Sequence, residues 1–236
     1  MKEPLISIVI PAFNEREYIA DALQSVKNQT YERLETIVVA NGCEDDTAKI
    51  ARESASLVIE TPVQGISYAK NVGFAHANGE VCAFMDADSR MKDDLAEKVY
   101  QSSMDGYDCG KAKIRPLDDD RLRGQVFCLY SEALSRMTSI VSFIDSGAGA
   151  FMYATRDLFD QIKQEEGEIF KTKLKVMEDV DLLTKLKKKG SYKFITDSCL
   201  YTSMRRFMDE GYLKCFIEDS IHVVSPEGKD RKRWEK

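Results

Sequence analysis

Two aspartates separated by one small residue follow five apolar residues in the stretch Val81-Cys82-Ala83-Phe84-Met85-Asp86-Ala87-Asp88. The apolar run has the length of a strand that is buried on both faces of a parallel sheet. Open α/β sheets bind ligands at the carboxyl ends of such strands. Neighbouring carboxylates repel each other unless a cation lies between them, and oxygen ligands of this kind suit Mg²⁺ or Mn²⁺. The stretch therefore predicts a metal site at Asp86 and Asp88, although an ordinary turn after a strand has the same pattern.

A second acidic pair, Glu178-Asp179, opens a stretch with apolar residues on one helical face and lysines on the other. A carboxylate placed near a hydroxyl group can accept its proton and act as a general base. The same residue types are also favoured in the first turn of a helix, where they interact with the helix dipole. Asp179 is therefore a candidate catalytic base or a helix cap.

The elements that must position these carboxylates alternate between strand and helix in the first hundred residues. Strands are expected at 5–10, 34–39, 57–60 and 81–86, with helices after Asn14, after Asp45 or Asp46, from Gly65, and over 92–104. We expect Pro11 to end the pairing of the first strand, because proline cannot donate to a ladder. The alternation predicts an α/β fold with a Rossmann-like, mostly parallel central sheet flanked by helices.

The second half of the chain has a less regular pattern. We expect an edge strand at 111–115 ended by Pro116, a long helix at 121–141, strands at 151–154 and 192–195, and helices from 178 and from about 206. No repeat, low-complexity segment or linker divides the chain. We therefore expect a single domain over 1–236, with a regular half at 1–105 and a less regular half at 106–236.

Composition sets limits on the partners and on the compartment. The net charge of −6 argues against nucleic-acid binding, and no apolar run approaches the ~20 residues that span a bilayer. Six cysteines without a C-x-x-C pair predict free thiols and a cytoplasmic location. The basic tail at 229–236 and an apolar stripe at Phe207, Tyr212, Leu213 and Phe216 suggest peripheral association with the inner face of a membrane. The stripe is more typical of core packing than of a membrane surface, and the oligomeric state, homo-oligomer included, stays open.

The loops after the first, second and fourth predicted strands should meet at one edge of the sheet. They carry Pro11-Ala12-Phe13-Asn14-Glu15, Asn41-Gly42 and Asp86-Ala87-Asp88. An aromatic wall, an amide and a metal-holding carboxylate pair together suit a nucleoside diphosphate. Neither G-x-G-x-x-G nor G-x-x-x-x-G-K-[ST] follows the first strand, which argues against a dinucleotide fold and a P-loop NTPase.

Five motifs in a fixed order resemble the inverting family 2 glycosyltransferases, which have a GT-A fold. The motifs are IVIPAFNE (8–15), VANGCEDDT (39–47), GISYAKNVG (65–73), FMDAD (84–88) and MEDVDL (177–182). Each motif alone is weak, whereas five in the right order are specific. The resemblance covers most of the chain, and it implies a nucleotide-sugar-binding half at 1–105 and an acceptor-binding half at 106–236.

The resemblance implies a role for each matched position. Asp179 matches the catalytic base, Asp88 the metal ligand, and Asp86 a carboxylate near the ribose and the metal. Lys70 stands where the family commonly has an arginine near the nucleotide, although an ammonium cannot make the bidentate contact of a guanidinium. The nucleotide-binding residues are expected to be Pro11, Ala12, Phe13, Glu15, Asn41, Gly42, Lys70, Asp86 and Ala87. Diphosphate contacts are expected from Arg205 and Arg206, and acceptor contacts from Gly147, Gly149 and Glu178.

The expected function is a metal-dependent, inverting transfer of a sugar from a nucleotide-diphosphate donor to a hydroxyl acceptor. The donor is expected to be a UDP-sugar, the cofactor Mn²⁺ or Mg²⁺, and the acceptor a glycan or a lipid-linked molecule of glycan, glycolipid or cell-envelope synthesis. Two alternatives remain at this point. One is a sugar nucleotidyltransferase, which also places carboxylates at a sheet edge, and the other is a non-catalytic module that binds nucleotide sugars.

Overall fold

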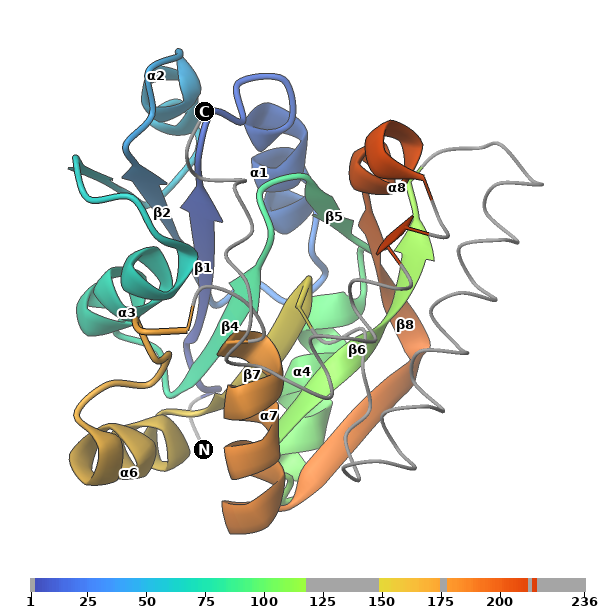
Figure 1. Cartoon of the computed structure of the whole chain (residues 1–236). Coiled ribbons are helices and arrows are strands. Elements are labelled where there is room, and N and C mark those ends of the chain that lie inside the picture. Colours follow the sequence, from blue (N-terminus) through green and yellow to red (C-terminus); the bar gives the residue numbers. More distant parts are fainter. Residues whose placement is uncertain (1–2, 118–148, 175–177, 212–213, 216–236) are drawn as a thin grey trace.

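The sheet runs through both halves of the chain. A computed structural model describes residues 3–117, 149–174, 178–211 and 214–215 of the 236. Its eight strands lie in the order β3-β2-β1-β4-β7-β6-β8-β5, with helices on both faces (Figure 1). The predicted helix at 121–141, the tail at 229–236 and three of the four residues of the apolar stripe lie outside the described residues, as does Gly147.

The first half forms the parallel part of the sheet. Strands β1, β2, β3 and β4 are all parallel to their neighbours in this group. The elements are β1 (Ile6–Ala12), α1 (Ile19–Lys27), β2 (Leu34–Asn41), α2 (Thr47–Ala51), β3 (Leu57–Thr61), α3 (Ile66–His76), β4 (Val81–Met85), β5 (Ser89–Met91) and α4 (Leu95–Met104). This arrangement confirms the predicted alternation and brings the carboxyl ends of β1, β2 and β4 to one edge.

The second half extends the same sheet. Strand β7 pairs antiparallel with both β4 and β6, and β6 runs parallel to β8. The elements are β6 (Cys109–Pro116), β7 (Phe151–Thr155), α6 (Arg156–Glu166), α7 (Glu178–Lys189), β8 (Tyr192–Thr202) and α8 (Arg205–Glu210). The first turn of α7 therefore presents the predicted Glu178-Asp179 pair.

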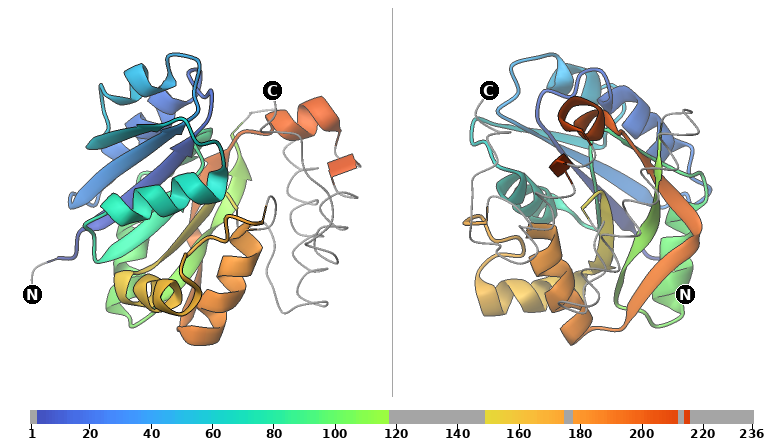
Figure 2. Two further views of the ribbon diagram at one scale, coloured as in Figure 1. Left: turned by 60° about the vertical axis from the view of Figure 1, so that its left-hand side comes forward. Right: turned by 45° about the vertical axis from the view of Figure 1, so that its right-hand side comes forward.

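Two apolar layers, one on each face of the sheet, form the core beneath the helices that Figure 2 shows on either side of the sheet. Residues of α1 and α4 pack on one face, and residues of α3, α6 and α7 pack on the other. Strand β4 contributes to both faces, because Ala83 and Met85 belong to the first layer and Cys82 and Phe84 to the second. A strand buried on both faces reads as a continuous apolar run, which is why the sequence marked β4 clearly.

Two predicted boundaries in the first half were wrong. Strand β1 continues through Pro11 to Ala12, because its pairing with β4 ends at Val9 and Pro11 pairs only with β2. Helix α1 begins at Ile19 and not directly after Asn14. Asn14 has a φ of 54°, and its side chain accepts a hydrogen bond from the Glu44 N–H at 2.9 Å, so it connects two loops and caps no helix.

The prediction that 111–115 forms an edge strand was also wrong. Strand β6 lies between β7 and β8, and it pairs with β7 over Cys109–Lys111. Pro116 is tolerated because that end of β6 pairs with β8 alone among the described strands. The pattern also missed β5, whose three residues pair with β8, and α6.

Helices of the described segments are all too short or too polar to cross a bilayer. The described cysteines, Cys43, Cys82, Cys109, Cys199 and Cys215, are free thiols.

Candidate active site

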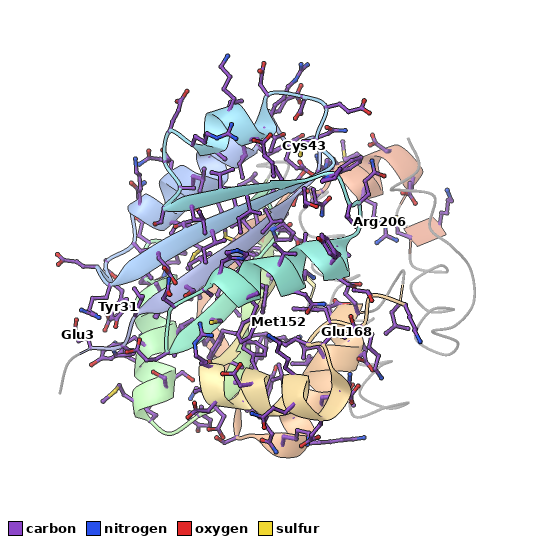
Figure 3. The ribbon with its side chains drawn as sticks, turned by 90° about the vertical axis from the view of Figure 1, so that its left-hand side faces the viewer. Glu3, Tyr31, Cys43, Met152, Glu168 and Arg206 are labelled. Atoms are coloured by element: carbon purple, nitrogen blue, oxygen red, sulfur yellow. The ribbon has the colours of Figure 1, made fainter. Side chains whose placement is uncertain are left out.

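The loops after β1 and β2 are joined by hydrogen bonds at the carboxyl edge of the sheet. The Glu15 N–H donates to Thr47 Oγ1 at 2.8 Å, and Asp45 accepts from the Thr47 N–H at 3.0 Å at the start of α2. Of the two predicted caps, Asp46 occupies the N-cap position of α2 without a side-chain cap hydrogen bond, and Asp45 lies one residue before it. In Figure 3, Cys43 and Arg206 lie toward this end of the strands, and Glu3 and Tyr31 lie toward the opposite end. The end of β1, with Pro11 and Ala12, and the loop that carries Phe13 and Glu15 are thereby held in place by the segment after β2.

The Asp86-Ala87-Asp88 turn is fixed by the backbone of the second half of the chain. The Asp86 N–H donates to the Ala150 carbonyl at 3.2 Å, just before β7. The Ser203 N–H donates to the Asp88 carbonyl at 3.1 Å, just after β8. Ala87 is buried, and both aspartate side chains remain partly exposed. Strands β7 and β8, which are distant in sequence, thus hold the carboxylate pair at the sheet edge.

Arg205, the first residue of α8, connects this turn with the loop after β1. Its Nη2 contacts Glu15 Oε1 and lies 3.0 Å from Asp88 Oδ2, and its guanidinium lies 4.7 Å from the Tyr18 ring centroid. Burial disfavours the charged form, but the hydrogen bond to Glu15 and the charge of Asp88 outweigh it, so the pKa of Arg205 is raised. Arg206 follows it, partly buried. Of the predicted diphosphate and metal residues, Arg205 and Asp88 are therefore in direct contact.

The carboxyl end of β2 presents a buried amide beside the first turn of α3. Asn41 is fully buried, and its Nδ2 donates to the Gly65 carbonyl at 3.2 Å. Asn41 Oδ1 and Ser67 Oγ are buried and have no hydrogen-bond partner among the described residues. Gly42 has a φ of 73°, which favours glycine. A buried polar atom without a partner is costly, so these two oxygens indicate a ligand or water site that sequence reasoning found only at Asn41.

Lys70 forms a buried ion pair with Glu178. Lys70 Nζ lies 3.0 Å from Glu178 Oε1, and the two side chains are only 2% and 9% exposed. The ammonium also lies 4.9 Å from the centroid of the Phe170 ring. Burial lowers the pKa of Lys70, but the charges of Glu178, Asp86 and Asp179 outweigh this effect and the pKa is raised. Carboxylates from two separate segments, Asp86 after β4 and Glu178-Asp179 at the start of α7, therefore lie within electrostatic range of one ammonium.

Asp179 lies next to the turn that precedes β7. A Cβ atom on Gly149 would lie 2.8 Å from Asp179 Oδ2. The adjacent Ala150 carbonyl is the acceptor for the Asp86 N–H, so residues 149–150 contact both acidic motifs. Burial, followed by repulsion from Glu178, raises the pKa of Asp179 to about 6 in spite of the opposing charge of Lys70. A carboxylate with such a pKa can accept a proton near neutral pH.

Comparisons with known proteins agree with this geometry. Residues 7–159, more than half of the chain, match Glycosyl transferase family 2. Glycosyltransferase AglE of Haloferax volcanii is 38% identical over 93 residues, which are 36% of this chain and 31% of that protein. The matched stretch spans about a third of the length of such curated relatives.

Solved structures share the fold at low sequence identity. S. aureus TarS 1-349 in complex with UDP-GlcNAc has a TM-score of 0.67 and 16% identity, and the match covers 96% of this chain and 68% of that chain. Glucosyl-3-phosphoglycerate synthase from Mycobacterium tuberculosis, in complex with Mn²⁺, UDP and phosphoglyceric acid, has a TM-score of 0.66 and 18% identity, covering 94% and 79%. The fold is therefore GT-A, as the sequence predicted. The family match includes most of the parallel part of the sheet, and the solved structures share the fold over nearly the whole chain. This chain therefore belongs to glycosyl transferase family 2.

Proposed function

We propose that this chain is a metal-dependent, inverting glycosyltransferase that moves a sugar from a nucleotide-diphosphate donor to a hydroxyl acceptor. The observation that carries this proposal is the contact of residues 149–150 with two acidic motifs: Ala150 with the Asp86-Ala87-Asp88 turn, and Gly149 with Asp179, whose pKa is raised to about 6. One motif is suited to the donor and the other to the acceptor hydroxyl. Their proximity supports this reaction class.

The donor that we propose is a UDP-sugar. The unpartnered oxygens of Asn41 and Ser67 would supply hydrogen-bonding groups for the base at the carboxyl end of β2. Glu15 and the loop after β1 would form the neighbouring wall. Complexes of the structural relatives with UDP or UDP-GlcNAc support the choice of uridine.

The chemistry of Asp86 and Asp88 fits a divalent cation. Both are hard oxygen ligands, and Asp88 already faces the positive charge of Arg205 at 3.0 Å. No group of three or more metal-ligating His, Cys, Asp or Glu occurs in the described part of the chain. Mg²⁺ and Mn²⁺ commonly bind through one or two carboxylates plus substrate phosphates, so two aspartates are sufficient. When bound, the ion would neutralise the charge that develops on the departing diphosphate.

Asp179 is the proposed catalytic base. Its carboxylate would take the proton of the acceptor hydroxyl while the hydroxyl oxygen bonds to the anomeric carbon and the bond to the diphosphate breaks. A single displacement of this kind inverts the anomeric centre. Arg205 would donate charge-assisted hydrogen bonds to the departing diphosphate.

We assign the donor to residues 1–105 and the acceptor to 106–236 of a single domain. The acceptor that we propose is a glycan or a lipid-linked molecule of glycan, glycolipid or cell-envelope synthesis. For a lipid-linked acceptor, the basic tail at 229–236 would bring the chain to an anionic bilayer surface. Flotation with anionic liposomes should decrease when residues 229–236 are deleted, and unchanged flotation would remove the tail from this role.

A nucleotide-sugar screen tests the proposal. UDP-sugars should stabilise the protein in a thermal shift assay with Mn²⁺ and much less with EDTA, because a bound ligand stabilises the folded state. Asp179→Asn should abolish transfer and keep UDP binding. Asp181→Asn is the matched control, because Asp181 lies on the same helix and pairs with Lys185 at 2.6 Å. Transfer by Asp179→Asn at the wild-type rate, or no effect of UDP with Mn²⁺, would refute the proposal.

A further inference from the structure

Lys70 is one of the largest fully buried side chains among the described residues. Its side chain is 2% exposed, and its ammonium is enclosed by the Glu178 carboxylate and the Phe170 ring. Glu178 is the first residue of α7 and immediately precedes Asp179. Helix α3 therefore contacts the first turn of the helix that carries the proposed base.

The residue after Lys70 strengthens this connection. Asn71 Nδ2 donates to the Phe170 carbonyl at 2.7 Å, and the Phe170 N–H donates to Asn71 Oδ1 at 3.0 Å. Two consecutive residues of α3 thus contact segments on either side of residues 175–177 in the sequence. Asn71 contacts Phe170 before them, and Lys70 contacts Glu178 after them. The contact atoms are an ammonium and an amide in the interior, where polar groups keep a fixed geometry only when they are paired.

We propose that Lys70 is a positioning residue for Asp179: by pairing with Glu178, it fixes the first turn of α7 and directs the Asp179 carboxylate to the space beside Gly149. This inference rests on the proposed function, in which Asp179 is the base. It assigns Lys70 to the acceptor side of the reaction and not to the nucleotide.

Electrostatics gives Lys70 a second effect on the base. The groups that act on Asp179 are Glu178 on its own helix and Lys70 on α3, and Asp86 after β4 acts on the same ammonium. Glu178 and burial favour the protonated form of Asp179, whereas Lys70 favours the carboxylate. Without the ammonium, fewer Asp179 side chains would be ionised at neutral pH.

The test compares Glu178→Gln with the double variant Lys70→Met, Glu178→Gln. In the first, Lys70 can still donate to the amide oxygen. In the second, the ammonium is lost as well, and Glu178 is not left as an unpaired buried carboxylate. Three quantities are measured: the Kd of UDP by calorimetry, the pKa of Asp179 by ¹³C NMR of its carboxyl group, and kcat. Lys111→Met is the matched control, because Lys111 is another buried lysine, 3% exposed, in β6.

Loss of Lys70 in the Glu178→Gln background should leave the Kd of UDP within about twofold and raise the pKa of Asp179 by about 1. It should also lower kcat by roughly tenfold to a hundredfold, because misplaced catalytic groups are that costly. Lys111→Met should change none of the three. A tenfold loss of UDP affinity, an unmoved Asp179 pKa or a retained kcat would overturn the inference.

Two further outcomes are separated by the same design. If the wild-type protein has no transferase activity, the proposed function fails, while the Kd and the Asp179 pKa still decide whether Lys70 acts on Asp179. If the double variant does not fold, Lys70→Met with Glu178→Leu replaces the buried pair by apolar side chains, which folded proteins often tolerate. UDP affinity and kcat are then measured on that variant, with the same expectations.

Discussion

Gly149→Ala is a small change that should act directly on the proposed base. An added Cβ would lie 2.8 Å from Asp179 Oδ2, whereas ordinary contacts begin at 3.4 Å. The carboxylate would therefore have to move by about 0.6 Å, the difference between these two distances. Gly149 does not have a positive φ, so the backbone at this position is compatible with alanine.

This displacement of the Asp179 carboxylate allows the loss in kcat to be predicted. A shift of about 1 Å from the productive geometry can cost roughly a hundredfold in rate, so 0.6 Å should cost on the order of tenfold in kcat. That factor corresponds to about 1.4 kcal/mol of activation free energy. UDP affinity should not change, since the substitution lies beside the base and not beside Asn41.

The assay is steady-state transfer with saturating donor, together with calorimetry for UDP. Gly149→Val should lose more activity than Gly149→Ala because its side chain is larger. Gly167→Ala is the control: its Cβ would meet nothing within 4 Å, although its φ of 83° should make that variant less stable. Wild-type kcat in Gly149→Ala, or a loss confined to UDP affinity, would refute the reasoning.

Three more predictions concern the charges and the amide of the site. Burial raises the pKa of Asp179 from 3.8 to about 6, so the ionised side chain destabilises the folded state. Asp179→Asn removes this charge. It should therefore raise the free energy of unfolding by up to about 3 kcal/mol above pH 6, and should leave it unchanged below about pH 4. Urea unfolding at pH 4 and pH 8 measures this, and an equal gain at both values contradicts it. Asn41→Leu should weaken UDP binding about tenfold in calorimetry, because the buried Oδ1 is lost as an acceptor; unchanged affinity would remove Asn41 from the donor site. Arg205→Gln should strengthen Mn²⁺ binding in the absence of nucleotide, because it removes the guanidinium that lies 3.0 Å from Asp88. Electron paramagnetic resonance of free Mn²⁺ measures this binding, and weaker binding by the variant would contradict the prediction.

Local patterns were sufficient for the parallel half of the fold. The apolar run of β4, the Asp45-Asp46 pair before α2 and the glycine that opens α3 are all short-range signals, and each was placed within a few residues of its observed position. The same signals failed where a residue has a distant partner. Asparagine is a residue type that often caps a helix, yet the Asn14 side chain accepts a hydrogen bond from the Glu44 N–H in the loop after β2.

The second half depended more on distant contacts. Strand β6 was expected at an edge and lies inside the sheet, because a pattern of alternating residues does not reveal which strands flank it. Ser67 was missed as well. A serine in the first turn of a helix is common, and only its burial without a partner distinguishes it.

The sequence by itself determined the fold class, the five ordered motifs and the identity of the carboxylates, because these depend on residue type and local spacing. Tertiary structure alone decided that Arg205 bridges Glu15 and Asp88, that Lys70 pairs with Glu178, and that Gly149 lies against Asp179. The physical reason is that an ion pair or a steric contact is a property of two atoms in space. Lys70 and Glu178 are 108 positions apart, and only the packing of α3 against the start of α7 brings them within 3.0 Å.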